Sequence, residues 1–308
     1  MRSRRPERHN GERFFGNAAS RSWAALAAAG LLWVAGCGTA ATGRSTDAGV
    51  HGAVRIVVSG SSTIGPLLRE VAGRYERRHP GVRVDVQTGG SARGLSDVRR
   101  GLSDIGMVSR ALTEAERDVR GYVIGFDAIA VIVHADNPVE ELSMEQLREV
   151  YRGSIDRWTP LGGRDEPVVV VHKAEGRSTL EMFLRATGLD NREVRPDVVA
   201  GENEQVIKSV VANRSAIGYV SLGAALYDIA DGAPIRVLPL DGVLPDENTV
   251  RSGTYPITRT LTLVTRPQPA PAVTAFLAFV RSADSADLFA RWHFVQEVSA
   301  TDRPPTVY

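Results

Sequence analysis

GSSTIGP at residues 60–66 and GRSTLE at residues 176–181 indicate the architecture of this chain. Each stretch follows a run of apolar β-formers, Val54–Val58 before the first and Val168–Val171 before the second. Each leads into a segment with the apolar spacing of a helix. Both stretches are therefore interpreted as a strand, a hydroxyl-rich turn and the N-terminus of a helix.

The two turns carry further signals of a helix start. Pro66 suits a first helical turn, where its missing N–H removes no hydrogen bond, and Ser178 and Glu181 have the spacing of a capping box. The first N–H groups of a helix have no acceptor within it, and the helix dipole is positive there, so such a turn attracts anions. With a third turn, GGSARG at residues 89–94, the sequence predicts a converging anion site. The alternative interpretation is that these Ser and Thr residues only cap helices.

Strands and helices alternate along the chain. Residues 54–110 have a β-α-β-α-β pattern, and the long apolar strand Tyr122–His134 leads into further α/β units. This order predicts an α/β fold with mostly parallel sheets flanked by helices. Ligands of such sheets bind at the carboxyl ends of the strands, where we expect Ser62, Ser91 and Asp104.

The first 36 residues have the layout of a signal peptide. Six arginines are followed by the apolar run Trp23–Ala35, which is short for a bilayer span. The run ends at VAGC, residues 34–37, which resembles a bacterial lipobox whose Cys is lipidated. Cys37 is the only cysteine, so no intramolecular disulfide forms. The alternative is an ordinary signal anchor with an incidental Cys. Residues 37–52 are rich in small residues and predict a flexible tether.

The charge balance excludes one class of partner. The chain has 37 basic and 36 acidic residues, and residues 1–36 contain 6 and 2 of them. The remaining chain has 31 basic and 34 acidic residues, a formal charge of −3. We therefore expect no basic surface for nucleic acid.

Seven motifs occur in the order found in one known family. They are GSST at 60–63, GGS at 89–91, DIG at 104–106, Trp158, KAEGRST at 173–179, AIGYV at 216–220 and SGTYP at 252–256. From about Val54 to Val298 the chain resembles the phosphate-binding lipoproteins of phosphate ABC importers. The resemblance implies a type II periplasmic-binding-protein fold with a ligand cleft between two lobes. It implies residues 53–130 plus 262–308 for lobe 1 and residues 131–261 for lobe 2.

The resemblance also implies a ligand set from both lobes. The implied ligands are Ser62, Thr63, the Ile64 N–H, Ser91 and Asp104 from lobe 1, and Lys173, Arg177, Ser178 and Thr179 from lobe 2. Hydroxyl and N–H groups donate to oxyanion oxygens. A carboxylate at Asp104 is favourable only toward an anion that carries a proton, as hydrogen phosphate does and sulfate does not. The alternative for Asp104 is that it caps a local turn.

The second-lobe motif departs from the family pattern. The family has arginine where this chain has Lys173, and Gly-Ser-Gly-Thr where this chain has GRST at residues 176–179. Lysine is a point charge and cannot form the bidentate fork of arginine. Arg177 either restores that fork from a new position or crowds the anion. Anion binding is thus a firmer expectation than phosphate as the anion.

The predicted function is an extracytoplasmic, lipid-anchored, monomeric receptor that captures inorganic phosphate and delivers it to an ABC permease. The alternatives are a receptor for another tetrahedral oxyanion, a phosphate sensor without transport, an adhesion protein and a secreted phosphatase. The proposed cleft has neither metal-ligand spacing of His, Asp and Glu nor a Gly-x-Ser-x-Gly turn. We therefore expect no enzyme activity, no metal and no cofactor.

Overall fold

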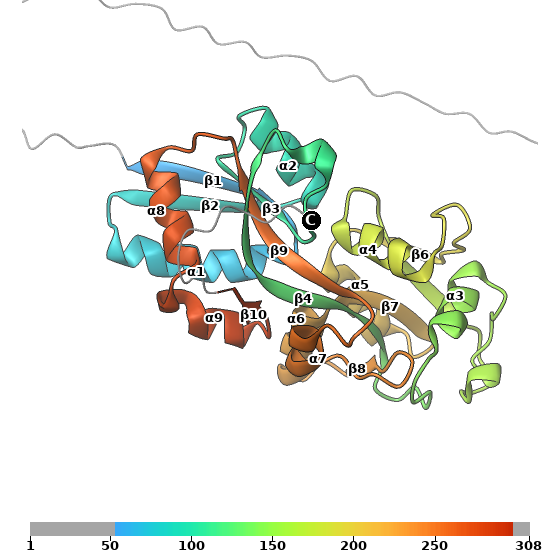
Figure 1. Ribbon diagram of the computed structural model, residues 1–308. Helices are drawn as coiled ribbons and strands as arrows, with labels where there is room; N and C mark the ends of the chain where they lie inside the picture. Colours follow the sequence, from blue (N-terminus) through green and yellow to red (C-terminus); the bar gives the residue numbers. More distant parts are fainter. Residues whose placement is uncertain (1–52, 298–308) are drawn as a thin grey trace, which may run out of the picture. The chain divides into compact units, whose positions relative to one another are not determined.

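The computed structural model describes residues 53–297 (Figure 1). The expected signal peptide, Cys37 and the whole tether lie outside the described residues, as do residues 298–308. The strands are β1 (Val54–Gly60), β2 (Val82–Thr88), β3 (Ile105–Val108), β4 (Arg120–His134), β5 (Val169–Lys173), β6 (Val198–Ala200), β7 (Ala216–Ser221), β8 (Ile235–Leu238), β9 (Thr258–Thr265) and β10 (Val295–Gln296). The α-helices are α1 (Gly65–Arg78), α2 (Ser91–Arg99), α3 (Met144–Arg152), α4 (Ser178–Thr187), α5 (Asn203–Ala212), α6 (Leu222–Ala230), α7 (Glu247–Ser252), α8 (Pro271–Val280) and α9 (Ala286–Arg291).

The strands form one mixed sheet in the order β2-β1-β3-β9-β4-β7-β5-β6, with β8 and β10 paired to β4. The pairs β1–β2, β1–β3, β5–β6 and β5–β7 are parallel. All pairs that involve β4 or β9 are antiparallel. Parallel α/β units thus lie on both sides of an antiparallel centre. We call β1–β3 with α1, α2, α8 and α9 the first lobe, and β5–β8 with α3–α6 the second lobe.

The long strand β4 belongs to both lobes. Its residues 120–128 pair with β9, and its residues 129–134 pair with β7 and β8. Figure 1 shows β4 and β9 running side by side between the lobes. The lobe limits expected from the sequence, at 130/131 and 261/262, stay predictions. Strand β9 pairs along its whole length with residues 120–128 of β4 and also pairs with β3.

Each lobe has its own apolar core. In the first lobe, Leu67, Leu68 and Val71 of α1 pack against strand residues and against α8 and α9. In the second lobe, the rings of Phe183 and Tyr219 stack with centroids 3.9 Å apart. Burial of these side chains is the main stabilising contribution and fixes which face of each helix meets the sheet.

Two helix starts lie at hydroxyl-rich turns that the sequence singled out. Helix α2 begins at Ser91, so the GGS turn lies at its N-terminus. The capping box predicted for Ser178 is wrong, because the N-cap of α4 is Arg177 and the Ser178 hydroxyl has no partner. By contrast, Ser143 caps α3 and accepts the N–H of Gln146.

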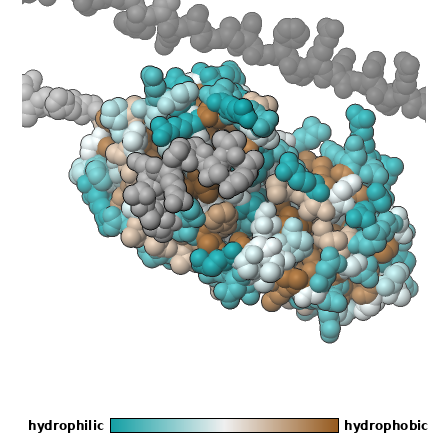
Figure 2. All heavy atoms as spheres, viewed as in Figure 1, coloured by the Kyte–Doolittle hydropathy of each residue, from teal (hydrophilic) through white to brown (hydrophobic). Residues whose placement is uncertain are grey.

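Within residues 53–297, no helix combines the length and the hydropathy that crossing a bilayer requires. The face drawn in Figure 2 carries many hydrophilic side chains on both lobes, with hydrophobic residues between them.

The end of β1 depends on a glycine. Gly60 has φ +132°, and a Cβ there would overlap the backbone of Met107 on β3. We expect Gly60→Ala to lower the free energy of unfolding by about 3 kcal/mol or more, because both the backbone strain and the overlap must be accommodated. Chemical denaturation of the purified chain measures this change.

Gly162→Ala is the matched control. Gly162 also has a positive φ, +81°, but a Cβ at this position would meet no other atom within 4 Å. The Gly162→Ala variant should lose only about 1–2 kcal/mol of unfolding free energy, which is the strain of the left-handed backbone alone. Equal losses in the two variants would contradict the close approach of β1 and β3.

Candidate functional site

The three hydroxyl-rich turns meet where the two lobes face each other. The N–H of Ala92, in the first turn of α2, donates to the carbonyl oxygen of Gly176 at 3.3 Å. The turn that precedes α4 therefore lies against the turn that begins α2. Buried side chains link the turn before α1 to the other two.

Each of the strands β1, β2 and β3 is followed by a buried serine of the first lobe. The hydroxyl of Ser61 donates to Ser109 Oγ at 3.0 Å, and the Ser109 N–H donates to Ser91 Oγ at 3.3 Å. All three residues are almost fully buried. The carboxyl ends of the three parallel strands thus contribute one connected group of hydroxyls.

Arg259 of β9 lies at the centre of the site and was not expected from the sequence. Its Nη2 donates to Thr63 Oγ1 of the first lobe at 3.0 Å, and its Nη1 donates to Thr179 Oγ1 of the second lobe at 2.9 Å. Its Nη1 also lies 3.5 Å from Ser109 Oγ. One guanidinium therefore contacts both halves of the predicted ligand set.

Asp127 of β4 holds this guanidinium in place. Its Oδ2 accepts from Arg259 Nη2 at 2.7 Å and from Nε at 3.0 Å, and both side chains have 0% exposure. The Ser221 hydroxyl and the Gly223 N–H also donate to this carboxylate. The sequence signal for the pair was a single acid within the mostly apolar β4 and a single base within β9.

Lys173 is a cation of the second lobe and lies next to the hydroxyl groups, in the place expected from the sequence. It is 2% exposed, and its Nζ donates to Asn203 Oδ1 at 3.0 Å. Asn203 Nδ2 in turn donates to Thr63 Oγ1 across the lobes at 3.4 Å. Burial is the main cause that lowers the pKa of Lys173 to about 7, and the nearby Arg259 and Arg177 lower it further, against the opposing effect of Glu202.

The N-terminus of α4 contributes hydrogen-bond donors to the site around Arg259. Ser178 and Thr179 occupy its first turn, where backbone N–H groups have no acceptor within the helix. Ser178 is 2% exposed, yet its Oγ has no hydrogen-bond partner. A buried hydroxyl without a partner costs free energy, so this group favours a bound acceptor.

Arg177 does not extend toward the hydroxyls as a fork. Its Nη1 pairs with Glu202 Oε1 at 2.7 Å, and its side chain lies against Gly90 of the α2 turn. Its Nε and Glu202 Oε2 are buried without partners. Arg177 thus forms part of the wall between the lobes, with its charge compensated by Glu202.

The expected position of Asp104 is wrong. Asp104 precedes β3, and its Oδ2 accepts the N–H of Val57 at 2.8 Å. Ser109, at the other end of β3, lies five residues further along, roughly 16 Å in an extended strand. Asp104 is therefore at the amino end of the strand, on the edge of the sheet opposite the hydroxyls. Its side chain instead accepts a backbone N–H of β1, 47 residues earlier in the chain, so the alternative interpretation as the cap of a local turn is wrong as well.

The two remaining first-lobe candidates differ in placement. Ser62 is half-buried and makes no side-chain hydrogen bond within residues 53–297. Ile64 is the N-cap of α1, and its side chain is fully buried in the core. Its backbone N–H, the group expected to bind, lies at the start of that helix.

An ion pair closes the lobes beside the site. Arg110, which follows β3, donates to Glu181 Oε2 of α4 at 2.6 Å and to both carboxylate oxygens of Glu116 at 2.8 Å. The hydrogen bond with Glu116 is the largest cause that raises the pKa of Arg110. Arg110 is thus a structural link between lobes rather than a free cation.

Within the described part of the chain, no group of three or more His, Cys, Asp and Glu side chains could hold a metal ion. The site instead consists of hydroxyls, helix N-termini, one arginine and one lysine. Groups of this kind donate hydrogen bonds to an anion.

A family model described as a PBP superfamily domain matches residues 39–284. The chain belongs to this superfamily. Its fold is that of the type II periplasmic binding proteins, as expected from the sequence.

Relatives within the PBP superfamily carry consistent names. Phosphate-binding protein PstS of Bacillus subtilis is 27% identical over 268 residues, which cover 84% of this chain and 87% of that protein. PstS of Borreliella burgdorferi is 26% identical over 243 residues, 76% of this chain and 86% of that protein. The expected resemblance to phosphate-binding proteins of ABC importers is confirmed.

Solved structures agree. A putative phosphate ABC transporter substrate-binding protein with bound phosphate from Clostridium perfringens has a TM-score of 0.74 at 28% identity, covering 79% of this chain and 99% of that one. An ABC-type phosphate transport receptor from Vibrio cholerae has a TM-score of 0.65 at 28% identity, covering 79% and 100%.

The location of Asp104 leads to a direct test. We expect Asp104→Asn to change the affinities for phosphate and for sulfate by less than about twofold, because roughly 16 Å of strand separates it from the hydroxyls. Calorimetric titration with each anion measures both affinities. A selective loss of phosphate binding would show that Asp104 is a ligand after all.

Proposed function

We propose that this chain is an extracytoplasmic substrate-binding protein that captures inorganic phosphate and delivers it to an ABC permease. The observation that carries the proposal is the position of Arg259. Held by Asp127, it contacts hydroxyls of both lobes at 2.9 and 3.0 Å. A group of donors completed only when two lobes meet is suited to enclosing a small anion.

The proposed ligands are seven side chains and one backbone group. They are Thr63, Ser91, Ser109, Lys173, Ser178, Thr179, Arg259 and the N–H of Ile64. The hydroxyls that accept from Arg259 keep their own hydrogens, which can donate to an anion in the same cavity. Ser62 would lie at the edge of this set, and Arg177 would form its wall.

The names of the relatives support phosphate, rather than another anion, as the ligand of this chain. The two PstS relatives, which match this chain over most of their own length, are named as phosphate-binding proteins. The similar protein from Clostridium perfringens was solved with bound phosphate. The donors in this chain also suit a tetrahedral oxyanion, because they come from two lobes and several helix N-termini rather than from one plane. We propose no catalytic role for these residues.

Capture would require closure of the lobes. The contacts Asn203–Thr63 and Arg110–Glu181 join the lobes around the site. They must break before an anion can leave, since its donors are buried on both sides. Release would therefore follow lobe opening, which docking on a permease would promote.

The membrane anchor is proposed from the sequence alone. Lipid attached to Cys37 would tether the folded body through residues 38–52 at the extracytoplasmic face, and the body would act as a monomer. Incorporation of labelled palmitate that is lost in Cys37→Ser tests this anchor.

Calorimetric titration of residues 38–308 with phosphate, and separately with sulfate, tests the function. The protein is first unfolded and refolded to remove carried-over ligand. We expect micromolar or tighter binding of phosphate and much weaker binding of sulfate. Equal binding of both would support a general oxyanion receptor, and no heat with either would contradict the proposal.

Thr179→Val tests the proposed ligand set. The change keeps the shape of the side chain but removes the hydroxyl, so phosphate affinity should fall about tenfold or more. Thr187→Val is the matched control, because Thr187 is buried in the same helix and its hydroxyl donates to the Phe183 carbonyl. An equal loss of affinity in both variants would indicate a general effect on α4.

Lys173 makes binding depend on pH. Because the pKa of Lys173 is about 7, raising the pH above that value removes its charge in the free protein. A bound anion favours the charged form, so the lysine-dependent part of the affinity should fall as pH rises, by at most about tenfold per pH unit.

The control for this prediction is Lys173→Arg, whose side chain stays charged throughout. Phosphate itself titrates in the same range, but its effect cancels in the ratio of wild-type to variant affinity at each pH. We expect this ratio to fall from about pH 7 to about pH 9. A constant ratio would show that Lys173 does not interact with the anion.

A further inference from the structure

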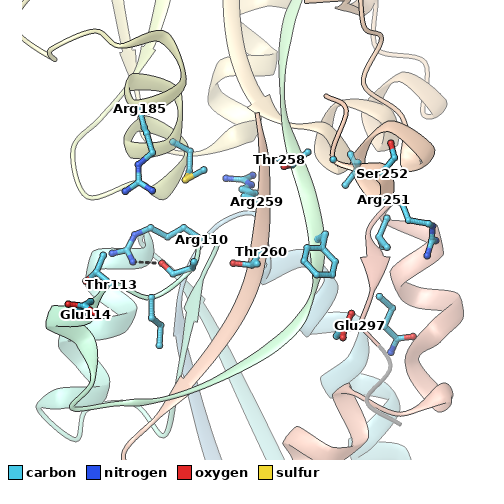
Figure 3. Close-up of a pocket in the computed structure, with 18 residues that line it drawn as sticks. Arg110, Thr113, Glu114, Arg185, Arg251, Ser252, Thr258, Arg259, Thr260 and Glu297 are labelled. Carbon is cyan, nitrogen blue, oxygen red and sulfur yellow. Dashed lines mark hydrogen bonds between the residues drawn. The ribbon is translucent and has the colours of Figure 1, made fainter. Parts of the chain in front are cut away.

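A second hollow lies beside the anion site. It has a volume of about 840 Å³ and is lined by the loop after β3, by α4, by the end of α7 and by β9 and β10 (Figure 3). Pockets that hold small organic molecules have volumes of this order. The proposed phosphate ligands other than Arg259 do not line it.

The hollow and the anion site lie on opposite faces of β9. Side chains alternate along a strand, so Thr258 and Thr260 face away from the side to which Arg259 points its guanidinium. Thr258 and Thr260 line the hollow, whereas the Arg259 guanidinium contacts Thr63 and Thr179. Arg259 therefore separates the two compartments.

The lining combines cations with apolar side chains. Figure 3 shows Arg185 at one end of the hollow and Arg251 at the other, with Thr260 between them. Within residues 53–297 neither arginine has an ion-pair partner, and the Glu114 at the rim is paired with Arg117. One further acid, Glu297, lines the same end as Arg251.

Apolar side chains also line the hollow. Phe126 of β4, Met182 of α4 and Val250 of α7 contribute to its wall. A ligand that fits this lining has an apolar body and a negative group for the arginines.

Several buried polar atoms without hydrogen-bond partners belong to residues of the anion site or of the hollow. Residues 53–297 contain six such side-chain atoms, and three of them belong to the anion site, on Arg177, Ser178 and Glu202. Two more, Thr260 Oγ1 and Gln296 Oε1, belong to residues that line the hollow. Unpartnered buried polar atoms are rare in folded proteins, and five of the six thus belong to residues of the anion site or of the hollow.

We propose that this hollow is a second ligand site, which takes a small organic anion with an apolar body. The occupant would contact both lobes, because the walls come from the loop after β3 and from α4, which the Arg110–Glu181 pair joins at 2.6 Å. The site is separate from the proposed phosphate site and does not depend on it.

Fluorescence titration with 1-anilinonaphthalene-8-sulfonate tests the proposal, since this probe has an apolar body and one sulfonate. The titration uses residues 38–308 under conditions in which the chain is fully folded. We expect saturable binding of one probe per chain. Arg185→Ala should weaken it about fivefold, the effect of losing one partly exposed charge contact.

Arg192→Ala is the matched control, because Arg192 is exposed, unpaired within residues 53–297 and outside the hollow. It should leave probe binding unchanged. Saturating phosphate should not displace the probe, because Arg259 lies between the compartments.

Four outcomes would overturn the proposal. They are the absence of saturable binding, equal effects of Arg185→Ala and Arg192→Ala, competitive displacement by phosphate, and probe binding that occurs only after removal of residues 298–308. The last outcome would show that the chain end, which continues from Glu297 at the wall, is the occupant instead.

Discussion

The buried ion pair between Asp127 and Arg259 is the interaction on which the rest of this structure depends. It joins the two strands that run between the lobes, and both side chains are inaccessible to solvent. Removing either partner would leave an uncompensated charge in the interior, which typically costs several kcal/mol. The same pair directs a guanidinium at Thr63 and Thr179, so the connection between the lobes and the centre of the site are one feature.

Much of the fold followed from the sequence because its signals are local. Apolar runs before hydroxyl-rich turns identified β1 and β5, which the structure contains. The antiparallel centre was harder to predict. An apolar strand such as β4 has the same pattern whether its neighbours run parallel or antiparallel, and only distant pairing decides between them. The start of α4 also escaped prediction, because Ser178 has the spacing of a cap but its buried hydroxyl makes no hydrogen bond.

The candidate site was predicted where a turn carries its own residues and missed where the fold brings them together. Thr63, Ser91 and Thr179 lie in or beside such turns and Lys173 ends the strand before one, and the structure gathers them. Arg259 lies on a strand far along the chain, and no turn marks it. Asp104 illustrates the opposite error, since the motif that contains it was recognised but the end of the strand on which it lies was assigned incorrectly.

Among the described residues, the charges of the anion site itself are nearly all compensated, unlike those of Arg185 and Arg251 in the neighbouring hollow. Asp127 balances Arg259, Glu202 balances Arg177, and Glu116 and Glu181 surround Arg110, while Lys173 is only partly protonated near neutral pH. Such a cleft projects little electric field into the solvent, because paired charges cancel at a distance. Anions would therefore reach it by diffusion without long-range attraction, and the association rate would change little with ionic strength. An anion site built in this way would work similarly in dilute and in salty surroundings.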